Sequence, residues 1–246
     1  PHGKVCYVTG ALYGAKQSGA RFYQHFAGTL HDLGFRSMHG DECVFVREVD
    51  GEIRTVISLY VDDGLIAGDL SPLDDLQRVY TLKVSAPRYM LGLGLDFDAS
   101  KRSVSISQRA YVDTMLRRFG MEQSKPVPTP TTAERLVAYD STDEDAPPRV
   151  DVTLYRSMVG SLLFAARQSR PDILFATCEL ARHMQDPRQP HLQAAKRALR
   201  FLRGTPTLGV VLAGGSKSEP VKVDVYTDAD WAGHCLLYTS DAADDI

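Results

Sequence analysis

Hydrophobic side chains first recur at helical spacing in residues 18–33, where Phe22, Phe26 and Leu30 fall on one face. Gly34 follows at the position where a glycine commonly ends a helix. The pattern therefore predicts an amphipathic helix with a single apolar face.

The next segment alternates between short apolar runs and turn residues. Apolar runs at residues 43–47, 53–61 and 65–67 are separated by Asp50-Gly51 and by the acidic turn Asp62-Asp63-Gly64. Asp-Gly between two apolar runs is a strong hairpin signal. We therefore predict three strands in an antiparallel meander.

A second helix is predicted directly after the meander. Ser71 is the expected N-cap, Pro72 fits the first turn of a helix, and the acids that follow suit the helix dipole. The side chains expected to face inward are Leu73, Leu76, Val79 and Tyr80.

The remaining pattern predicts a hairpin, a polar linker, further helices and two strands. Residues 125–149 are rich in Pro, Thr and acids and too poor in apolar residues to fold alone, so we expect an extended linker there. The predicted strands are 91–98, 103–107, 208–212 and 221–227. The predicted helices are 108–119, with Tyr111, Met115 and Phe119 inward and Gly120 as its stop, then 151–168, 171–184 behind a Ser169 cap, and 190–202 ending at Gly204. Helices and antiparallel strands in separate runs indicate an α+β fold.

Composition is that of a folded globular protein, with 43% hydrophobic and 24% charged residues in 246. The sequence holds no apolar run of about 18 residues, so we expect no membrane partner. Cys6, Cys43, Cys178 and Cys235 lie far apart without C-x-x-C spacing. This spacing argues against a zinc site or a disulfide framework and favours a reducing, intracellular compartment.

The formal net charge of −3 argues mildly against nucleic-acid binding, but two segments are locally basic. Residues 78–118 hold eight Lys or Arg against three Asp, and residues 182–203 hold six against one. Either segment would suit a phosphate-binding surface, and either is equally consistent with a solvated helix face.

Two adjacent carboxylates, Asp62 and Asp63, stand at the tip of the second predicted hairpin. Adjacent carboxylates repel one another, and a cation bound between them would offset that repulsion. Asp-Asp-Gly is also good turn chemistry. Taken alone, the tetrapeptide at residues 60–63 leaves both interpretations open.

Several stretches, in the same order and at compatible spacing, resemble motifs in the reverse transcriptase region of the copia-type LTR-retrotransposon Pol polyprotein. Leu-Tyr-Gly-Ala-Lys-Gln-Ser at 12–18 resembles LYGLKQ(S/A)PR, and Ser-Leu-Tyr-Val-Asp-Asp at 58–63 resembles the LLYVDD box. Residues 107–121 resemble SQ-x-x-Y…L-x-x-FGM, residues 125–130 resemble KPV-x-TP, and residues 155–163, 170–173 and 194–200 resemble the helical region that follows. The resemblance covers nearly all of residues 3–233.

The resemblance implies an RNA-directed DNA polymerase that copies an RNA template from a DNA or RNA primer, using deoxynucleotides and Mg²⁺ or Mn²⁺. It implies an intracellular protein, in a cytoplasmic virus-like particle and later in the nucleus for integration. Lys16 would meet phosphate as a point charge. The implied catalytic and metal-binding residues are Asp62 and Asp63, and the implied nucleotide- or primer-binding residues are Tyr60, Val61, Gln17 and Lys16.

The sequence departs from these motifs at Ala15 for Leu, Gly19 for Pro and Gly64 for a large aliphatic residue, which bears on local packing. Polymerases of this kind also need an aspartate from an earlier QMDVKTAFL-like motif, and no such motif precedes Leu12. Two divalent ions need carboxylates from more than one strand. We therefore expect a fragment that is inactive by itself.

The last part of the chain divides in two. Tyr-Thr-Asp-Ala-Asp-Trp-Ala-Gly at 226–233 resembles the YSDADWAG opening of the family's RNase H domain, with Asp228 as candidate metal ligand, although a strand ending in an acidic turn gives the same pattern. Residues 235–246 instead resemble the translation of a transposase adapter from sequencing-library preparation. Without their three aspartates, 28 basic residues would balance 28 acidic ones.

We expect a reverse transcriptase palm and thumb remnant that runs into the start of an RNase H-like domain. A decayed or domesticated product that binds nucleic acid without catalysis is the alternative, and a scaffold without a nucleic-acid role is a third hypothesis. The expected parts are the C-terminal part of the palm (1–97), a thumb-like hairpin and helix (98–124), the linker (125–150), a helical connection (151–204), the start of the RNase H-like domain (205–234) and the adapter artefact (235–246).

Overall fold

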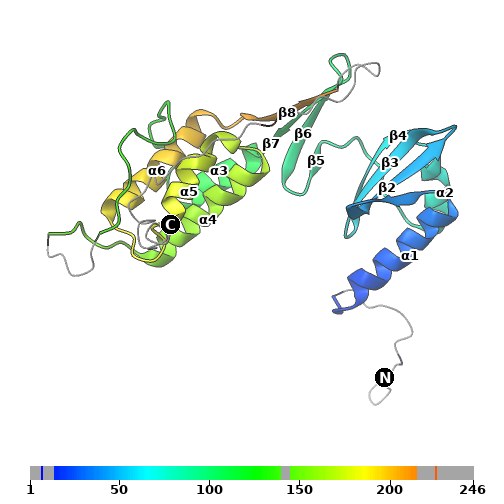
Figure 1. Ribbon diagram of the computed structural model, residues 1–246, viewed down its shortest axis with the longest axis horizontal. Coiled ribbons are helices and arrows are strands. Elements are labelled where there is room, and N and C mark those ends of the chain that lie inside the picture. Colours follow the sequence, from blue (N-terminus) through cyan, green and yellow to red (C-terminus); the bar gives the residue numbers. More distant parts are fainter. Residues whose placement is uncertain (1–6, 8–13, 140–144, 215–224, 226–246) are drawn as a thin grey trace, which may run out of the picture.

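The computed structural model describes Tyr7, residues 14–139, residues 145–214 and Val225. Helices and antiparallel sheets occur together, which confirms the predicted α+β class. Two separate groups of buried side chains form the hydrophobic cores. The first unit runs from α1 to α2, and the second contains the remaining helices with a second sheet beside them (Figure 1).

The first unit is a four-stranded sheet with two helices. Its strand order is β1-β2-β3-β4, so each strand pairs antiparallel with its neighbour in sequence and the predicted meander is confirmed. Asp50 and Gly51 connect β2 to β3 with φ angles of 54° and 76°, two positive values in succession as in a type I′ hairpin turn. The elements are α1 (Ser18–Asp32), β1 (Arg36–Met38), β2 (Asp41–Val49), β3 (Glu52–Tyr60), β4 (Asp63–Gly68) and α2 (Pro72–Val79).

Helix α1 covers one face of this sheet. Its buried Phe26 and Leu30 pack with Phe45 of β2 and Ile57 of β3. Each side chain of this size stabilises the fold by about 1.5–3 kcal/mol when it leaves water completely. The apolar face read from the helical spacing is therefore the face that meets the sheet.

Helix α2 begins where predicted, with Ser71 at the N-cap and Pro72 in the first turn, but the capping bond and part of the inner face differ from the prediction. The Ser71 side chain makes no capping bond, and the backbone of Ser71 is helical (φ −52°, ψ −33°) rather than extended as is usual for a capping residue. Its N–H and its hydroxyl both donate to the carboxylate of Asp69, at 3.0 and 2.7 Å. Arg47 also donates to Asp69, at 2.9 Å. The bonds from Ser71, together with Arg47, lower the pKa of Asp69. Leu76 is buried as predicted, whereas Val79, the last residue of α2, is exposed.

The second sheet is antiparallel with the order β5-β6-β7-β8. Its first turn was not predicted: Leu91 and Gly92, with φ angles of 52° and 84°, reverse the chain between Met90 and Leu93. Gly92 adopts a positive φ at no steric cost, so the strand expected from residue 91 begins after the turn. The last strand, β8, pairs with β7 although it comes from a distant part of the chain. The strands are β5 (Tyr89–Met90), β6 (Leu93–Asp98), β7 (Ser103–Ser107) and β8 (Gly209–Ala213).

The register gives this second sheet one apolar and one polar face. Side chains of directly paired residues lie on the same face, and alternate residues along a strand lie on opposite faces. Phe97 and Leu212, at the open end of the apolar face, keep 53% and 55% of their surface exposed. The apolar face carries Leu95, Phe97, Val104, Ile106, Val210 and Leu212, and the other face carries Asp96, Asp98, Ser103, Ser105, Ser107 and Val211.

The remaining helices pack around the second core. The helix predicted at 171–184 is divided into a short 3₁₀ turn and α5. Ser169 is not its cap, because Ser169 is the C-cap residue of α4 and Arg170 stands at the start of the 3₁₀ turn; the Ser169 hydroxyl donates to Oε1 of buried Gln108 at 2.9 Å. Within the described residues, no helix is long and apolar enough to cross a membrane. The elements are α3 (Arg109–Arg118), α4 (Val152–Gln168), η1 (Pro171–Ile173), α5 (Leu174–Ala181) and α6 (Gln189–Gly204).

A fully buried arginine links the start of η1 to the end of α6. Arg170 donates to Asp172 through Nε and Nη2, at 2.9 and 2.7 Å, and to the carbonyl oxygen of Thr205 at 2.8 Å. Its guanidinium also lies 5.5 Å from the ring centroid of Phe201. A buried guanidinium needs such partners, because leaving one without them is strongly destabilising.

The predicted linker forms no helix or strand in its described part, as expected, but it is bound to the second unit. We call residues 122–139 and 145–150 the strap. Its backbone and side-chain oxygens accept hydrogen bonds from successive arginines on one side of α6. These bonds join Arg203 to the carbonyl oxygen of Glu122 (2.6 Å), Arg200 to that of Lys125 (2.6 Å) and Arg197 to the hydroxyl of Thr129 (2.8 Å).

The first unit yields a stability prediction at Gly68, where β4 ends. Gly68 has φ of 98°, and a Cβ atom there would lie 2.1 Å from the backbone oxygen of Arg54. We expect Gly68→Ala to lower the free energy of unfolding by about 1–3 kcal/mol, measured by urea denaturation. The matched control is Gly28→Ala within α1, where nothing lies within 4 Å of the added atom; it should stabilise by about 1 kcal/mol. Equal effects of the two changes would contradict this account.

Candidate active site

The two candidate metal-binding carboxylates lie at the tip of the β3–β4 hairpin. Tyr60 of β3 pairs directly with Asp63 of β4, so Val61 and Asp62 alone reverse the chain. The turn is therefore one residue earlier than the predicted Asp62-Asp63-Gly64. Gly64 belongs to β4 and is not among the positive-φ glycines, so its lack of a side chain is not what makes the turn.

Val61 has a backbone conformation that is unusual for its residue type. Its φ is 56°, in the left-handed region where a β-branched residue is a genuine outlier. The Cβ of an L-residue crowds the carbonyl there, at a cost of roughly 1–2 kcal/mol. The strain is localised between the two residues of greatest chemical interest, Tyr60 and Asp62.

The hairpin separates a buried side from an open one. Leu59, 6% exposed, belongs to the core under α1, and the next residue, Tyr60, is 58% exposed. Because Asp63 is paired with Tyr60, its side chain shares the open face. Asp62, in the turn, is also exposed. The aromatic ring and the carboxylates are thus accessible to a large ligand, while the strand that carries them is fixed by the core.

The chemistry of the hairpin suits a hard divalent cation. Asp62 and Asp63 supply carboxylate oxygens, which Mg²⁺ and Mn²⁺ prefer. In the described part of the chain, neither carboxylate takes part in an ion pair, and no group of three or more His, Cys, Asp or Glu residues is placed to hold a metal ion. The hairpin alone therefore offers two carboxylates rather than a complete cage.

Lys16 and Gln17 lie where α1 begins. Gln17 is the N-cap residue but makes no side-chain capping bond, and both residues are exposed. Among the hydrogen bonds and ion pairs of the described residues, none joins either side chain to Asp62 or Asp63. The structure leaves both side chains available to a ligand and does not bring them into contact with the carboxylates, so their roles stay predictions.

Gly64, where the resembling motif has a large aliphatic residue, is paired with buried Leu59 on the α1 side of the sheet. A Cβ atom at Gly64 would meet only the backbone oxygen of Ser58, at 3.8 Å, which is an ordinary contact. The departure therefore leaves room beside Leu59 without distorting the hairpin.

The two basic segments have different surroundings. In the second segment, three arginines of α6 donate to the strap, and Arg188 donates to Asp186 at 2.9 Å and to the carbonyl oxygen of Pro147 at 3.1 Å. Much of its charge is therefore used within the fold. In the first segment, Arg109 and Arg117 of α3 are exposed and bond only locally, to Asp113 and to Thr114. The first segment is the better candidate for a phosphate-binding surface.

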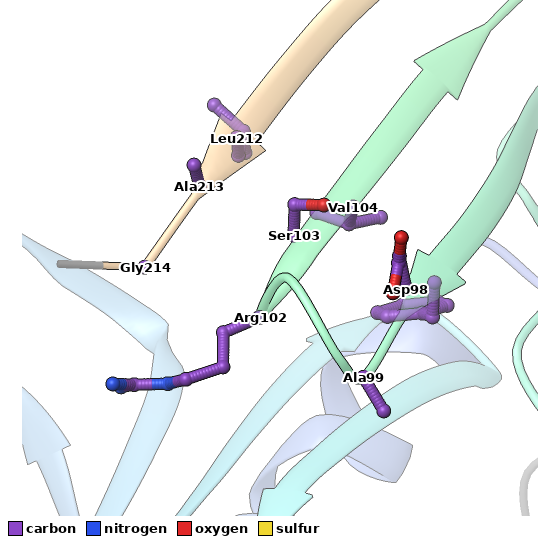
Figure 2. A pocket seen from close by; sticks show the side chains of 9 residues that line it. Asp98, Ala99, Arg102, Ser103, Val104, Leu212, Ala213 and Gly214 are labelled. Carbon is purple, nitrogen blue, oxygen red and sulfur yellow. The ribbon is translucent and has the colours of Figure 1, made fainter.

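A shallow depression beside β6, β7 and β8 is not a second candidate for catalysis. Figure 2 shows its lining, in which Val104 and Leu212 lie near the β6–β7 turn. Its one acidic residue, Asp98, accepts bonds from the N–H groups of Ser100 and Lys101, at 3.0 and 3.1 Å. The bonds from Ser100 and Lys101 lower the pKa of Asp98. Its carboxylate thus stabilises the turn.

Asp228 and residues 235–246 lie outside the described residues, as does most of the strand predicted at 221–227.

Sequence reasoning missed the strained backbone of Val61 and the arginine contacts of α6. The sequence held a signal for the first of these. The apolar runs on either side of Asp62 and Asp63 leave few residues for a turn, and Val61 is not a glycine. No local signal pointed to the second.

Residues 1–133 match the family described as reverse transcriptase (RNA-dependent DNA polymerase). The chain is 35% identical to the Retrovirus-related Pol polyprotein from transposon RE1 of Arabidopsis thaliana, over 96% of this chain and 16% of that protein. It is 33% identical to the Retrovirus-related Pol polyprotein from transposon TNT 1-94 of Nicotiana tabacum, over 93% of this chain and 18% of that protein. A Saccharomyces cerevisiae protein named for transposon Ty5-1 is 30% identical, over 89% of this chain and 70% of that protein.

The chain thus spans less than a fifth of the length of the two Pol polyproteins that it matches. No solved structure gives a significant match to it. The resemblance noted from the motifs at residues 12–18 and 58–63 is confirmed by these matches.

The strain at Val61 gives a testable prediction. We expect Val61→Gly to leave the free energy of unfolding within about 1 kcal/mol of the parent, or to raise it, because relief of the strained φ offsets the greater freedom of glycine in the unfolded chain. Val49→Gly is the control, since Val49 is also exposed, lies in β2 and has no positive φ; it should destabilise by about 1 kcal/mol. A similar loss in both variants, measured by urea denaturation, would show that Val61 is not strained.

The role of the α6 arginines is tested with Arg200→Ala. Loss of its bond to the Lys125 carbonyl oxygen should lower the free energy of unfolding by about 1–3 kcal/mol, with little change in salt-dependent affinity for a primer-template. Lys196→Ala, on the same helix and without a bond to the strap among the described residues, should leave stability nearly unchanged. A selective loss of nucleic-acid affinity in Arg200→Ala would instead assign this arginine to phosphate binding.

Proposed function

Because the chain belongs to the reverse transcriptase family, we propose that Asp62 and Asp63 supply metal-binding carboxylates for DNA synthesis on an RNA template. The chain corresponds to the reverse transcriptase region of retrotransposon Pol polyproteins. Members of this family use divalent metal ions. The activity belongs to the longer protein of which this chain is a fragment.

The observation that carries the proposal is the rigid, open hairpin with two carboxylates at its tip. Nucleotidyl transfer needs cations held close to a triphosphate, where they activate the primer 3′-hydroxyl and stabilise the leaving pyrophosphate. Buried Leu59 fixes the strand, and the two-residue turn fixes Asp62 and Asp63 relative to it. A carboxylate on a mobile loop would lose part of this preorganisation.

The neighbouring residues have supporting roles in this proposal. Tyr60 shares the open face with Asp63 and would contact the primer end or the incoming nucleotide through its exposed ring. Val61 would meet the same ligand from the turn. Lys16 and Gln17, at the start of α1, would approach the phosphates and the nucleotide, with Lys16 acting as a point charge.

The finer architecture is part of the same proposal. Residues 1–97 would be the C-terminal part of the palm and residues 98–124, with α3, would be thumb-like. Residues 205–234 would begin an RNase H-like domain with Asp228 as a metal ligand. The longer protein would act inside the cell, in a cytoplasmic particle and then in the nucleus. Its partners would be an RNA template, a primer and deoxynucleotides.

The carboxylates can be tested in the chain itself. Mn²⁺ added to the isotopically labelled chain should broaden the amide NMR signals of residues 60–64 first. Asp62→Asn and Asp63→Asn should weaken this broadening, because each removes one anionic ligand. The control is Asp50→Asn, which makes the same change in the turn at the other end of β3. Broadening that survives both changes at residues 62 and 63 would refute the metal assignment.

Catalysis is tested in the longer protein, with the natural upstream sequence restored. Asp62→Asn should reduce extension of a labelled primer on an RNA template by about 100-fold or more while primer-template affinity stays nearly the same. The chain of 246 residues without that sequence should not extend the primer. Binding without any extension by the restored protein would favour the non-catalytic alternative.

A further inference from the structure

A buried histidine at the start of α6 makes two directional hydrogen bonds. Nδ1 of His191 accepts from the backbone N–H of Arg188 at 2.9 Å. On the other side of the ring, Nε2 lies 2.9 Å from the carbonyl oxygen of Val137, in the strap. A carbonyl can only accept, so Nε2 carries the hydrogen, and Nδ1 is free to accept from the N–H only while the ring is neutral.

The environment of this ring disfavours charge. His191 is 1% exposed, and the ring of buried His183 stacks on it with centroids 4.0 Å apart. The rings of Tyr139, from the strap, and Tyr155, from α4, lie 5.7 and 6.5 Å away. The Tyr155 hydroxyl is turned away, because it donates to the carbonyl oxygen of Leu180 at 2.8 Å.

The charged groups around His191 are Asp186 and Arg188, together with Arg149 of the strap. Asp186 lies between the two guanidinium groups, 2.9 Å from that of Arg188 and 3.0 Å from that of Arg149. The carboxylate is therefore already shared by two cations. It is not available as a full counter-ion for a third positive charge.

The backbone N–H of Arg188, which donates to His191, lies among hydrogen bonds that join the end of the strap to the start of α6. We call these contacts, between residues 147–150 and residues 186–189, the latch. Val150 donates to the carbonyl oxygen of Pro187 at 3.1 Å, and Gln189 donates to that of Pro148 at 2.9 Å. Arg188 side-chain Nη1 donates to the carbonyl oxygen of Pro147 at 3.1 Å.

We propose that His191 makes the latch sensitive to protons: binding of one proton at Nδ1 opens the contacts between residues 147–150 and 186–189. The added proton converts Nδ1 from acceptor to donor. The Arg188 N–H then faces an N–H rather than a lone pair, and the charged ring lies beside the Arg188 guanidinium and the stacked His183. The bond from Nε2 to Val137 survives, so the strap stays attached at that point while the start of α6 separates from residues 147–150.

The direction of the pH effect follows from burial. Burial lowers the pKa of His191 below its ordinary value of 6.5, although the Val137 carbonyl and Asp186 act in the opposite direction. The unfolded chain therefore takes up the proton at a higher pH than the folded chain does. The stabilisation from neutral His191 is complete above about pH 6.5 and decreases as the pH falls below that value toward the folded pKa.

The experiment measures backbone amide hydrogen exchange of the whole chain at pH 7.5 and pH 5.5, with rates corrected for the intrinsic effect of pH. Peptides covering residues 147–150 and 186–191 should exchange about tenfold faster or more at the lower pH. Peptides from β1 to β4 should show no such change. Absence of the selective increase would overturn the proposal.

The variant His191→Asn separates titration from packing. An asparagine Oδ1 can accept from the Arg188 N–H but takes up no proton in this pH range. It should remove most of the pH effect, and His39→Asn, at an exposed position in the β1–β2 turn, should retain it. A pH effect that persists in a folded His191→Asn would contradict the proposal.

If His191→Asn does not fold, NMR titration of the unaltered chain tests whether protonation of His191 is coupled to the Arg188 N–H. The imidazole signals of His191 should titrate with a midpoint below the ordinary histidine value of 6.5, and the amide signal of Arg188 should shift with the same midpoint. An Arg188 amide that does not follow the titration of His191 would refute the coupling.

Discussion

The pairing of Tyr60 with Asp63 leaves only Val61 and Asp62 to reverse the chain between β3 and β4, and the candidate active site depends on this constraint. It explains the left-handed backbone of Val61 and puts the Tyr60 ring and the Asp63 carboxylate on the same face. It also places Leu59 in the core under α1. The buried anchor and the exposed carboxylates are thus within a few residues of each other, so packing against α1 controls the position of the site directly.

The second unit is held together in part by hydrogen bonds from arginine side chains to oxygen atoms of the strap. The strap has few apolar residues and forms neither helix nor strand in its described part, so its backbone needs partners elsewhere. Arginines of α6 donate to it. Arg170 has a similar structural role. Asp172 neutralises its charge, and its Nη1 donates to the carbonyl oxygen of Thr205. Positive charge in this unit therefore acts first as structural hydrogen bonding, which explains why a basic stretch of sequence need not be a basic surface.

Much of the fold could be predicted because its signals are local. The helical spacing of Phe22, Phe26 and Leu30 gave α1 to within one residue, and Asp50-Gly51 gave the first hairpin turn. The two acids at the end of an apolar strand left a metal site and a simple turn open, and the resemblance of residues 58–63 to the LLYVDD box favoured the metal site. Asp62 and Asp63 are exposed above the core of the first unit, and their role as metal ligands stays a prediction.

The rest depends on partners that are distant in sequence. Ser169 resembles a helix cap in the sequence, but in the fold its hydroxyl donates to Gln108, the residue before α3. Arg200 resembles a phosphate ligand, but in the fold it donates to the carbonyl oxygen of Lys125. Ser71 stands at the N-cap but makes no capping bond, because its backbone is already helical; its hydroxyl donates to nearby Asp69. Periodicity describes which face of a segment is apolar. It does not describe which polar group will find a better acceptor once the chain is folded.

The presence of two cores with no buried residue in common has a consequence for cooperativity. Each group of buried side chains can lose its order without removing a contact from the other, so the chain is not bound to fold as a single all-or-none unit, and a single unfolding free energy need not describe it. Substitutions in the two cores should combine additively, because among the described residues no buried side chain belongs to both cores. A chain built this way can accumulate damage in the helices of the second unit, α3 to α6, and still present an intact Asp62–Asp63 hairpin.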